Sequence, residues 1–424
     1  MRAQFRLSIC AGRRSRGASQ AGFTLVELMV SMTGGLFLTM VVFALSRDAS
    51  RFYQGENRAA NATLSGLAGF ERLSSDLARA GHLSTPNINA DPHVCNPPQA
   101  GWPLMLRQLR ALVIDNNTVS ATTEVGAAGI SPQRILIAGA LNMPEVLTTS
   151  AVGPSGGGGW QISIDLTKPA AMRVGLIMGA GSETNNLPIL QRIFLTSDGQ
   201  GRIIRLRDHG MDQYAVTQGV AVGPNAAMVN LAATPDLVRT QAGGLQCGIP
   251  GNGTGMDLSV IDLVRYEIRS MTSEPAYAAL YRASGNGSGG TSSTPAPFEA
   301  QRAELARVEV DLADQDIPGT RELVAEYAVD LQFAAWGATS ATDPTIGQVT
   351  AAVDATYPFT QLIRAVHLRV SVRSREADRG GNVPGAAAGD LYRIGLGPGG
   401  TAPFARVRTF QADIPLRNLE NGNW

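Results

Sequence analysis

Residues 22–30 read Gly-Phe-Thr-Leu-Val-Glu-Leu-Met-Val and begin the apolar run that decides the fold of this chain. From Phe23 to Leu45 the sequence has 23 residues and a single charged side chain, Glu27. A helix of that length is roughly 34 Å long, which is enough to cross the hydrocarbon core of a bilayer. A carboxylate inside such a span costs about 3 kcal/mol. We therefore expect Glu27 to have a partner and a function.

The segment before the apolar run is basic. Residues 1–22 contain no acidic residue and five arginines, Arg2, Arg6, Arg13, Arg14 and Arg16. Because basic flanks stay in the cytoplasm, this asymmetry predicts a cytoplasmic N-terminus and an exported remainder. Outside this segment, 30 of the 35 basic residues remain against 35 acidic ones. A net charge of zero for the whole chain does not predict a nucleic-acid partner.

Three kinds of export signal fit an apolar run at this position. An ordinary secretory signal would use Ala44-Leu45-Ser46 as its cleavage site, and a twin-arginine signal would use Arg13-Arg14. Ordinary signals have an apolar core of about 7–15 residues, which is shorter than this run. The length of the run and the charge of Glu27 favour the third kind, a prepilin signal.

Residues 22–30 resemble the class III signal peptide of type IV pilins and type II secretion pseudopilins. The resemblance implies that prepilin peptidase cleaves between Gly22 and Phe23 and methylates the new amine of Phe23. Glu27 then becomes the fifth residue of the mature chain. A terminal amine with a pKa of about 7.7–8.0 is charged at neutral pH. We therefore expect Glu27 of an incoming subunit to pair with the amine of a neighbour, which offsets the desolvation of both charges.

The apolar run continues into an amphipathic segment. One helical stripe is predicted from the spacing of five apolar residues, Leu64, Leu67, Phe70, Leu73 and Leu77. Gly81 is a typical helix stop. The pattern predicts one helix over about residues 24–80, transmembrane in residues 23–46 and amphipathic in residues 47–81. Gly34-Gly35 fits a bend in this helix and fits close helix packing equally well.

Residues 82–424 have the pattern of a β-rich head. Short apolar or alternating runs predict strands at Arg134–Ala138, Trp160–Leu166, Arg173–Met178, Leu190–Leu195, Arg202–Leu206, Leu258–Ile268, Leu305–Leu312, Leu362–Val372 and Arg406–Ile414. Ser197-Asp198-Gly199 predicts a hairpin turn, and Glu322–Leu331 fits a helix or a strand. Glycine-rich loops are expected at Gly153–Gly159, Gly251–Gly255, Ser284–Pro297 and Gly380–Gly400. The predicted fold is α+β and pilin-like, a long N-terminal helix packed on a large antiparallel head.

Two cysteines remain after the basic segment is set aside. Cys95 and Cys247 lie 152 residues apart in a head that we expect to be exported. Disulfides are common in such compartments, so the pair predicts a disulfide bond. Two separate buried thiols are the alternative.

No catalytic, cofactor-binding or metal-binding residue is predicted. Matches to G-x-G-x-x-G and G-x-S-x-G occur only in glycine-rich stretches without strand and helix context, at residues 285–290, 395–400 and 153–157. His93-Val94-Cys95 has no second ligand pair at zinc spacing. The acidic group Asp311, Asp314 and Asp316 lacks the pattern of a calcium loop. The sequence therefore predicts a protein that is not an enzyme and needs no cofactor.

Later segments resemble PilW-type minor pilins of type IV pilus assembly. They are Leu73–Leu83, Leu263–Ile268 with Leu280–Arg282, Leu323–Trp336, Val366–Glu376 and Leu416–Asn418. Trp336-Gly337 departs from that family, which often has Tyr-Gly, and the glycine-rich loops are unusual for it. The resemblance implies a structural, assembly-initiating subunit that acts in twitching motility and cell adhesion.

The resemblance also implies partners and a location. The partners are prepilin peptidase, other minor and major pilins, the inner-membrane assembly platform and a tip adhesin. The chain would cross the inner membrane once before it enters the pilus. Two alternatives are a minor pseudopilin of type II secretion, of the larger J type, and an adhesive or DNA-uptake head. The latter predicts an exposed aromatic or basic patch, but the tryptophans Trp102, Trp160, Trp336 and Trp424 are scattered.

Processing after Gly22 is directly testable. Intact-mass and N-terminal analysis of membrane-purified protein should find methylated Phe23 as the first residue, and Gly22→Arg should leave the precursor uncut. A mature terminus near Arg47 would instead support ordinary secretory cleavage and reject the prepilin hypothesis.

Overall fold

The structure is a computed structural model of the chain. It describes residues 24–120, 122–155, 158–240, 247–272, 274–277, 301–340, 343–375, 392–396 and 404–419. The predicted cleavage residues Gly22 and Phe23 lie outside these ranges, as do Leu280–Arg282. The chain divides into two compact units, residues 1–57 and 58–424, and each is described by itself. Helix α1 (Leu25–Ala78) contributes residues to both units.

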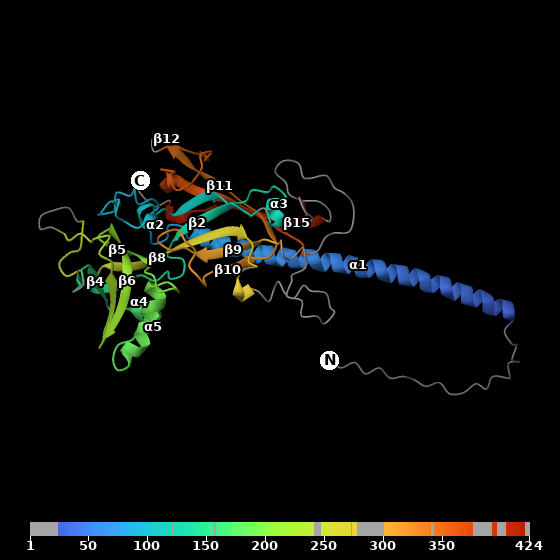
Figure 1. The fold of residues 1–424 in the computed structure, drawn as a ribbon, viewed down its shortest axis with the longest axis horizontal. Coiled ribbons are helices and arrows are strands. Elements are labelled where there is room, and N and C mark those ends of the chain that lie inside the picture. The colour runs from blue at the N-terminus through green and yellow to red at the C-terminus, as the bar shows by residue number, and fades with distance from the viewer. Residues whose placement is uncertain are drawn as a thin grey trace, which may run out of the picture. The chain divides into compact units, whose positions relative to one another are not determined.

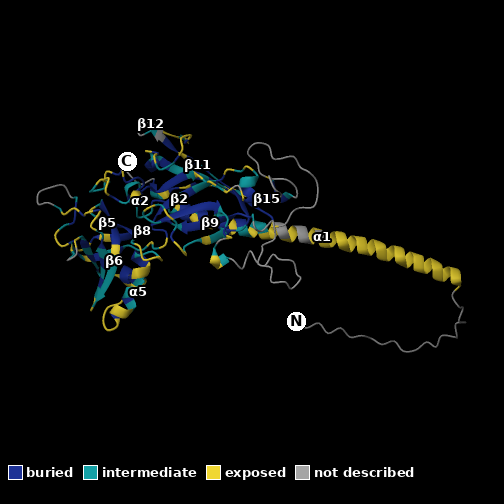
Figure 2. Ribbon diagram, in the orientation of Figure 1, coloured by how far each residue is buried: buried dark blue, intermediate teal, exposed yellow. Residues whose placement is uncertain are grey.

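In the first unit, residues 25–46 of α1 are uncharged apart from Glu27, and all of them are exposed. Leu25–Ser50 is long and apolar enough to cross a membrane, and none of it is buried within the chain. Figure 2 shows the described residues of this part of α1 as exposed. The helix stays α-helical through Gly34 and Gly35, and apart from the helix's own adjoining backbone no described atom lies within 4 Å of a Cβ built at either glycine. A fully exposed apolar helix needs an apolar environment, which a bilayer or other helices provide.

The second unit contains two antiparallel sheets around the C-terminal turns of α1 (Figure 1). The first has the order β1 (Leu112–Asn116), β2 (Gln133–Gly139), β8 (Asp257–Arg269), β9 (Glu304–Glu309) and β10 (Glu322–Ala325). The second has the order β12 (Asp343–Gln348), β11 (Ala328–Ser340), β13 (Ile363–Arg373), β15 (Phe404–Pro415) and β14 (Arg393–Gly395).

Alternation along β8 assigns its two faces to different cores. Val264, Tyr266 and Ile268 join the core that contains Leu73 and Leu77 of α1. Leu263 instead joins a smaller core beneath the short helix α2 (Leu104–Arg107). This is the period-two pattern of a strand that is covered on both sides.

A closed barrel is inserted in the first sheet, between β2 and the second half of β8. Among the described strands, β3 (Leu147–Pro154), β4 (Trp160–Ile164), β7 (Ala226–Leu231), β6 (Met211–Gly223), β5 (Ile203–Asp208) and the first half of β8 pair in a ring. Helices α4 (Pro169–Arg173) and α5 (Ser182–Phe194) add apolar side chains to its own core. The long strand β8 therefore belongs to both the barrel and the sheet.

Two predicted strands are wrong. Arg173–Met178 is the end of α4 and a loop, because Pro169 begins a helix and Gly175, with φ of 93°, ends it. Leu190–Leu195 lies mostly in α5, in which Leu190, Ile193 and Phe194 have helical spacing and are buried. The predicted turn Ser197-Asp198-Gly199 is present: Leu195 and Gly201 on either side of it form an antiparallel bridge, and the turn joins the end of α5 to β5.

A cluster of buried charged side chains near the short helix α3 (Glu124–Ala127) connects the first sheet to the second. Arg373 of β13 donates two hydrogen bonds of 2.7 and 2.6 Å to Glu124. The guanidinium groups of Arg302 and Arg373 lie 4.8 and 4.5 Å from the ring centre of Tyr327, and Arg302 also pairs with Glu304. Breaking a buried pair of this kind costs about 3–5 kcal/mol, so the cluster fixes the two sheets relative to each other.

In the structure Cys95 and Cys247 form a disulfide bond, with their Cα atoms 5.4 Å apart. The backbone N–H of Cys95 also donates to Asp212 O of β6 at 2.9 Å. The bond attaches the segment before β8 to the loop that lies beside the barrel.

We expect this bond to form in the exported protein and to stabilise it. Replacing both cysteines with alanine should lower the free energy of unfolding by about 2–4 kcal/mol, because the unfolded chain regains the entropy of a long closed loop. Non-reducing peptide mapping of periplasm-exposed protein should give one linked peptide. Two freely alkylated thiols, or an unchanged unfolding curve for the double variant, would reject the prediction.

Candidate functional site

The first turn of α1 uses Glu27 as a cap. The Glu27 carboxylate accepts hydrogen bonds of 3.0 Å from the backbone N–H and the hydroxyl of Thr24. The Thr24 hydroxyl accepts one of 3.2 Å from the backbone N–H of Glu27. This reciprocal pair is a capping box, a T-x-x-E pattern that residues 24–27 display in the sequence. Glu27 therefore has a local partner in the single subunit, which the analysis of membrane cost alone did not predict.

The hydroxyl groups that follow Glu27 are also satisfied within α1. Ser31, Thr33 and Thr39 each donate to a carbonyl three or four residues earlier, at 2.9–3.0 Å. These bonds remove the cost of placing the hydroxyl groups in hydrocarbon. Glu27 is then the one charged side chain of Leu25–Leu45, all of which the structure describes.

The face of α1 that packs on the head differs from the predicted stripe. Leu73 and Leu77 are fully buried, but Leu64 and Leu67 are 66% and 40% exposed. Gly66 and Gly69 are buried in their place. A Cβ at Gly66 would lie 2.5 Å from the ring of Phe410 on β15, and a Cβ at Gly69 would lie 2.7 Å from Ala325 on β10. Two glycines thus let the helix approach both sheets closely.

A buried carboxylate attaches this part of the helix to the first sheet. Asp76 has no exposed surface, and its Oδ2 accepts hydrogen bonds from Tyr266 Oη at 2.7 Å and Arg307 Nε at 3.0 Å. Its Oδ1 accepts a bond of 2.9 Å from Arg79, which also donates to Leu141 O at 3.0 Å. Three donors therefore converge on Asp76, from β8, from β9 and from Arg79 in the turn directly after α1.

These partners keep Asp76 ionised. Burial alone would raise the pKa of its carboxyl group, but the hydrogen bond from Tyr266 and the charge of Arg307 outweigh burial and lower that pKa. Burial and the charge of Asp76 in turn raise the pKa of Tyr266 well above its usual value. The tyrosine stays a hydrogen-bond donor throughout the physiological range.

The end of α1 is fixed by the C-terminal segment. Gly81, with φ of 73°, turns the chain and donates its N–H to Ala138 O of β2 at 2.8 Å. The side-chain amide of Asn418 donates to the carbonyl groups of Ala78 and Ala80 at 3.2 and 3.3 Å. Asn418 therefore provides hydrogen-bond donors for carbonyl groups that have no partner within the helix.

The other candidate residues lie in structural interactions. His93 pairs with Asp91 at 3.2 Å, and Cys95 is in the disulfide. Asp311 accepts the backbone N–H groups of its own turn at 2.8 Å, and the remaining two aspartates of the acidic group pair with arginines. Within the described ranges, no group of three or more His, Cys, Asp and Glu side chains is placed to hold a metal ion.

Comparison with known proteins identifies one matching family model. Residues 17–33 match the prokaryotic N-terminal methylation motif. No curated protein and no solved structure matches the chain. The matched residues include the predicted cleavage position, the capping box and the first turns of the apolar helix.

The chain is a type IV pilin-like or pseudopilin-like precursor with a motif for cleavage by prepilin peptidase. Its fold is the pilin-like α+β type, a long N-terminal apolar helix followed by a large antiparallel β-rich head. It is a structural protein of this class and not an enzyme.

The role of Asp76 predicts a pH-dependent loss of stability. Asp76→Asn keeps the shape but removes the charge opposite Arg307, so the free energy of unfolding should fall by about 3–5 kcal/mol. The exposed Glu71→Gln on the same helix is the control. Because the pKa of Asp76 is lower in the folded state, its contribution is complete above the unfolded value of about 3.9 and is lost as the pH falls through the folded pKa. The difference between Asp76→Asn and the native protein should therefore narrow only below about pH 4. A difference that stays constant down to pH 3 would contradict this role.

Proposed function

We propose that this chain is a PilW-type minor pilin, a structural and assembly-initiating subunit of a type IV pilus. In this proposal, prepilin peptidase cleaves between Gly22 and Phe23 and methylates Phe23. The mature chain crosses the inner membrane once with its head in the periplasm, and its helix then enters a complex with other minor and major pilins on the assembly platform. The observation that carries the proposal is the methylation motif at residues 17–33 directly before an exposed apolar helix.

The minor-pilin assignment draws support from where the PilW-like segments lie. Leu73–Leu83 contains Asp76 and Gly81, Leu263–Ile268 contains Tyr266, and Leu416–Asn418 contains the residue that caps the helix end. The segments Leu323–Trp336 and Val366–Glu376 include parts of the paired strands β11 and β13. Segments that are far apart in the sequence thus surround the C-terminal half of α1, the part that a pilin uses to join stalk to head.

Unpaired apolar residues on α1 support an assembly role. Leu64 and Leu67 are exposed beyond the candidate span Leu25–Ser50, where the bilayer would not cover them. Exposed apolar side chains on a helix are stabilised when a second helix packs on them. In a pilus or its initiating complex, the helices of neighbouring pilins provide that surface.

Deletion of the gene distinguishes the pilus from the type II secretion system. The proposal expects surface pili to be lost or greatly reduced, because initiation fails, while secretion of type II substrates continues. Normal piliation with blocked secretion would favour the J-type pseudopilin instead.

The charge of Glu27 is tested separately from its capping role. Glu27→Ala and Glu27→Gln should both insert and be cleaved after Gly22, yet reduce co-purification with other pilins about tenfold or more through loss of an ion pair. Glutamine keeps the capping box and removes only the charge. Thr24→Val removes the hydroxyl of the cap and keeps the charge, so it should assemble nearly as the native protein does. Surface-pilus counts provide a second readout. Native assembly by both Glu27 variants would leave Glu27 without a docking role, and α1 would be a membrane anchor only.

A further inference from the structure

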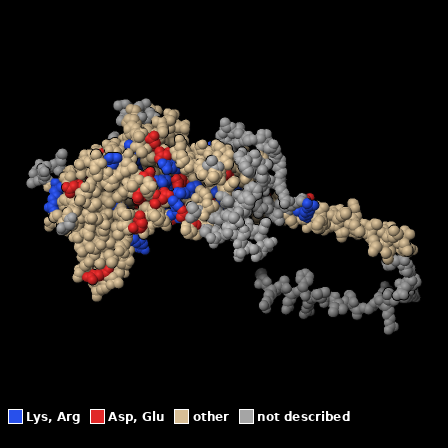
Figure 3. All heavy atoms as spheres, viewed as in Figure 1, with Lys and Arg blue, Asp and Glu red and all other residues tan. Residues whose placement is uncertain are grey.

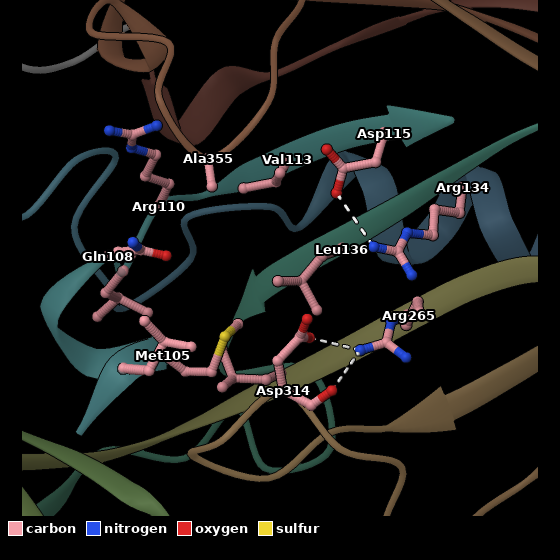
Figure 4. A pocket seen from close by; sticks show the side chains of 13 residues that line it. Met105, Gln108, Arg110, Val113, Asp115, Arg134, Leu136, Arg265, Asp314 and Ala355 are labelled. Carbon is pink, nitrogen blue, oxygen red and sulfur yellow. Dashed lines mark hydrogen bonds and ion pairs between the residues drawn. The ribbon is translucent and has the colours of Figure 1, made fainter. Parts of the chain in front are cut away.

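The head has a hollow of about 70 Å³ on the face of the first sheet that does not pack on α1 (Figure 4). Its two aspartates both pair with arginines of the same wall, Asp115 with Arg134 at 3.7 Å and Asp314 with Arg265. The wall therefore compensates its own carboxylates. Most of the large apolar side chains that the described part of the chain leaves exposed lie instead on α1.

Two charged residues delimit the uncharged part of α1. Arg47 lies 20 residues after Glu27, and no Asp, Glu, Lys or Arg occurs between them. Because a helix rises 1.5 Å per residue, their Cα atoms are about 30 Å apart along the axis, which equals the thickness of the hydrocarbon core. Figure 3 shows an uncharged surface along this part of α1, which ends at a group of charged side chains. In a helix that crosses the bilayer, Arg47 therefore lies at one edge of the hydrocarbon when Glu27 lies at the other.

An exposed aromatic pair follows this edge. Phe52 and Tyr53 are 66% and 68% exposed, and their rings lie edge to face with the centres 6.3 Å apart. They are the only large apolar or aromatic residues in residues 46–63. The Tyr53 hydroxyl forms no hydrogen bond with any residue that the structure describes. Apart from each other, the two rings therefore have no partner in the described chain.

The distance from Arg47 places both rings at the level of the lipid headgroups. The Cα atoms of Phe52 and Tyr53 lie about 8 and 9 Å beyond that of Arg47 along the helix axis. The headgroup region adds about 5–8 Å to each side of the hydrocarbon core. Aromatic side chains on a helix point back toward its N-terminus, which here is toward the membrane. The rings therefore lie within the headgroup region even though their Cα atoms lie at its outer limit.

The apolar surface of α1 ends at this depth. Leu45 lies seven residues before Phe52, on the same side of the helix, so the pair continues the apolar surface of the candidate span Leu25–Ser50. Residues 54–63 contain no large apolar residue, and the next exposed one, Leu64, is 11 residues beyond Tyr53. A partner helix would be contacted at every third or fourth residue along its whole length, whereas a bilayer covers the helix only up to this level. The pattern favours lipid as the occupant.

We propose that Phe52 and Tyr53 bind the headgroup layer on the periplasmic side of the inner membrane while the subunit is in the membrane, before assembly. Rings with an apolar body and a polar end are favoured at this level of a bilayer. The free hydroxyl of Tyr53 donates to a phosphate or ester oxygen of a lipid, and the phenyl ring of Phe52 covers the adjoining ends of the acyl chains. The inference rests on the proposed crossing of the inner membrane and adds the contact that fixes its outer end.

A tryptophan placed in α1 measures this depth. The purified mature chain is reconstituted in phosphatidylcholine vesicles, and quenching by a nitroxide on the lipid headgroup is compared with quenching by a nitroxide near the end of the acyl chain. Tyr53→Trp should be quenched about twofold more by the headgroup label, because the ring lies at that level. Leu38→Trp should show the reverse order, and Leu64→Trp should be quenched by neither label. The native protein, whose four tryptophans all lie outside α1, gives the background signal.

Two outcomes separate the anchor from the crossing itself. Tyr53→Trp that is quenched by neither label, or more by the chain-end label, would overturn the anchor while quenched Leu38→Trp leaves the crossing intact. If Leu38→Trp is also unquenched, the crossing is wrong and the anchor with it.

Loss of the two rings should expose the segment beside them. In the same vesicles, Ser50→Cys reacts with a membrane-impermeant maleimide, and adding Phe52→Ser and Tyr53→Ser should make it react severalfold faster. Tryptophan at both ring positions should restore the slow rate. Asn61→Cys, at an exposed position beyond the headgroups, should react equally fast with and without the rings. Equal rates at residue 50 with and without the rings would overturn the proposal, and protection that appears only when other pilins are added would assign the rings to a partner helix instead.

Discussion

The buried carboxylate of Asp76 is the interaction on which the head depends. It lies on the helix that begins in the apolar segment, and its hydrogen-bond donors come from β8, from β9 and from Arg79, directly after the helix. Burying one charge is stabilising only while its partners stay in place. Gly69 and Gly66, about two and three turns earlier, then set how close the helix comes to both sheets. The position of the two sheets around the last turns of α1 follows from these contacts.

The sequence predicted the elements with clear periodicity and missed those that depend on tertiary contacts. The long helix was predicted, and so were β2, β4, β5, β8, β9, β13 and β15, because apolar runs and turn residues mark them directly. Strands β1, β3, β6, β7, β12 and β14 were not predicted. The barrel was not predicted either, since ring closure depends on β5 pairing with β8 about fifty residues away. The end of helix α5 was predicted as a strand because Leu190–Leu195 is a short apolar run, and such a run does not distinguish a strand from a buried helix segment. The predicted apolar stripe was correct for Leu73 and Leu77 and wrong for Leu64 and Leu67, which are exposed. Gly66 and Gly69 face the sheets there, because the close approach leaves no room for a side chain.

The same contrast holds for the candidate site: contiguous motifs could be predicted from the sequence, whereas contacts between distant residues could not. The prepilin motif is contiguous, so residues 17–33 reveal the class of the protein without any structure. The capping box was equally visible as Thr24 and Glu27, three residues apart. In contrast, the partners of Asp76 lie 190 and 231 residues away, and the match of Asn418 to the helix end spans 340 residues. Such pairs follow from the register of strands, which a single sequence does not specify.

The central claim is that α1 packs against the helices of other pilin subunits after prepilin peptidase has cleaved the precursor. Photocrosslinking in cells from a probe at the exposed position of Leu64 tests it most directly, because a bilayer span of Leu25–Ser50 does not reach that position. The account predicts crosslinks to other pilin subunits in the native background and their loss when Gly22→Arg prevents processing. Crosslinks that are absent in the native background, or that persist unchanged in Gly22→Arg, would contradict it.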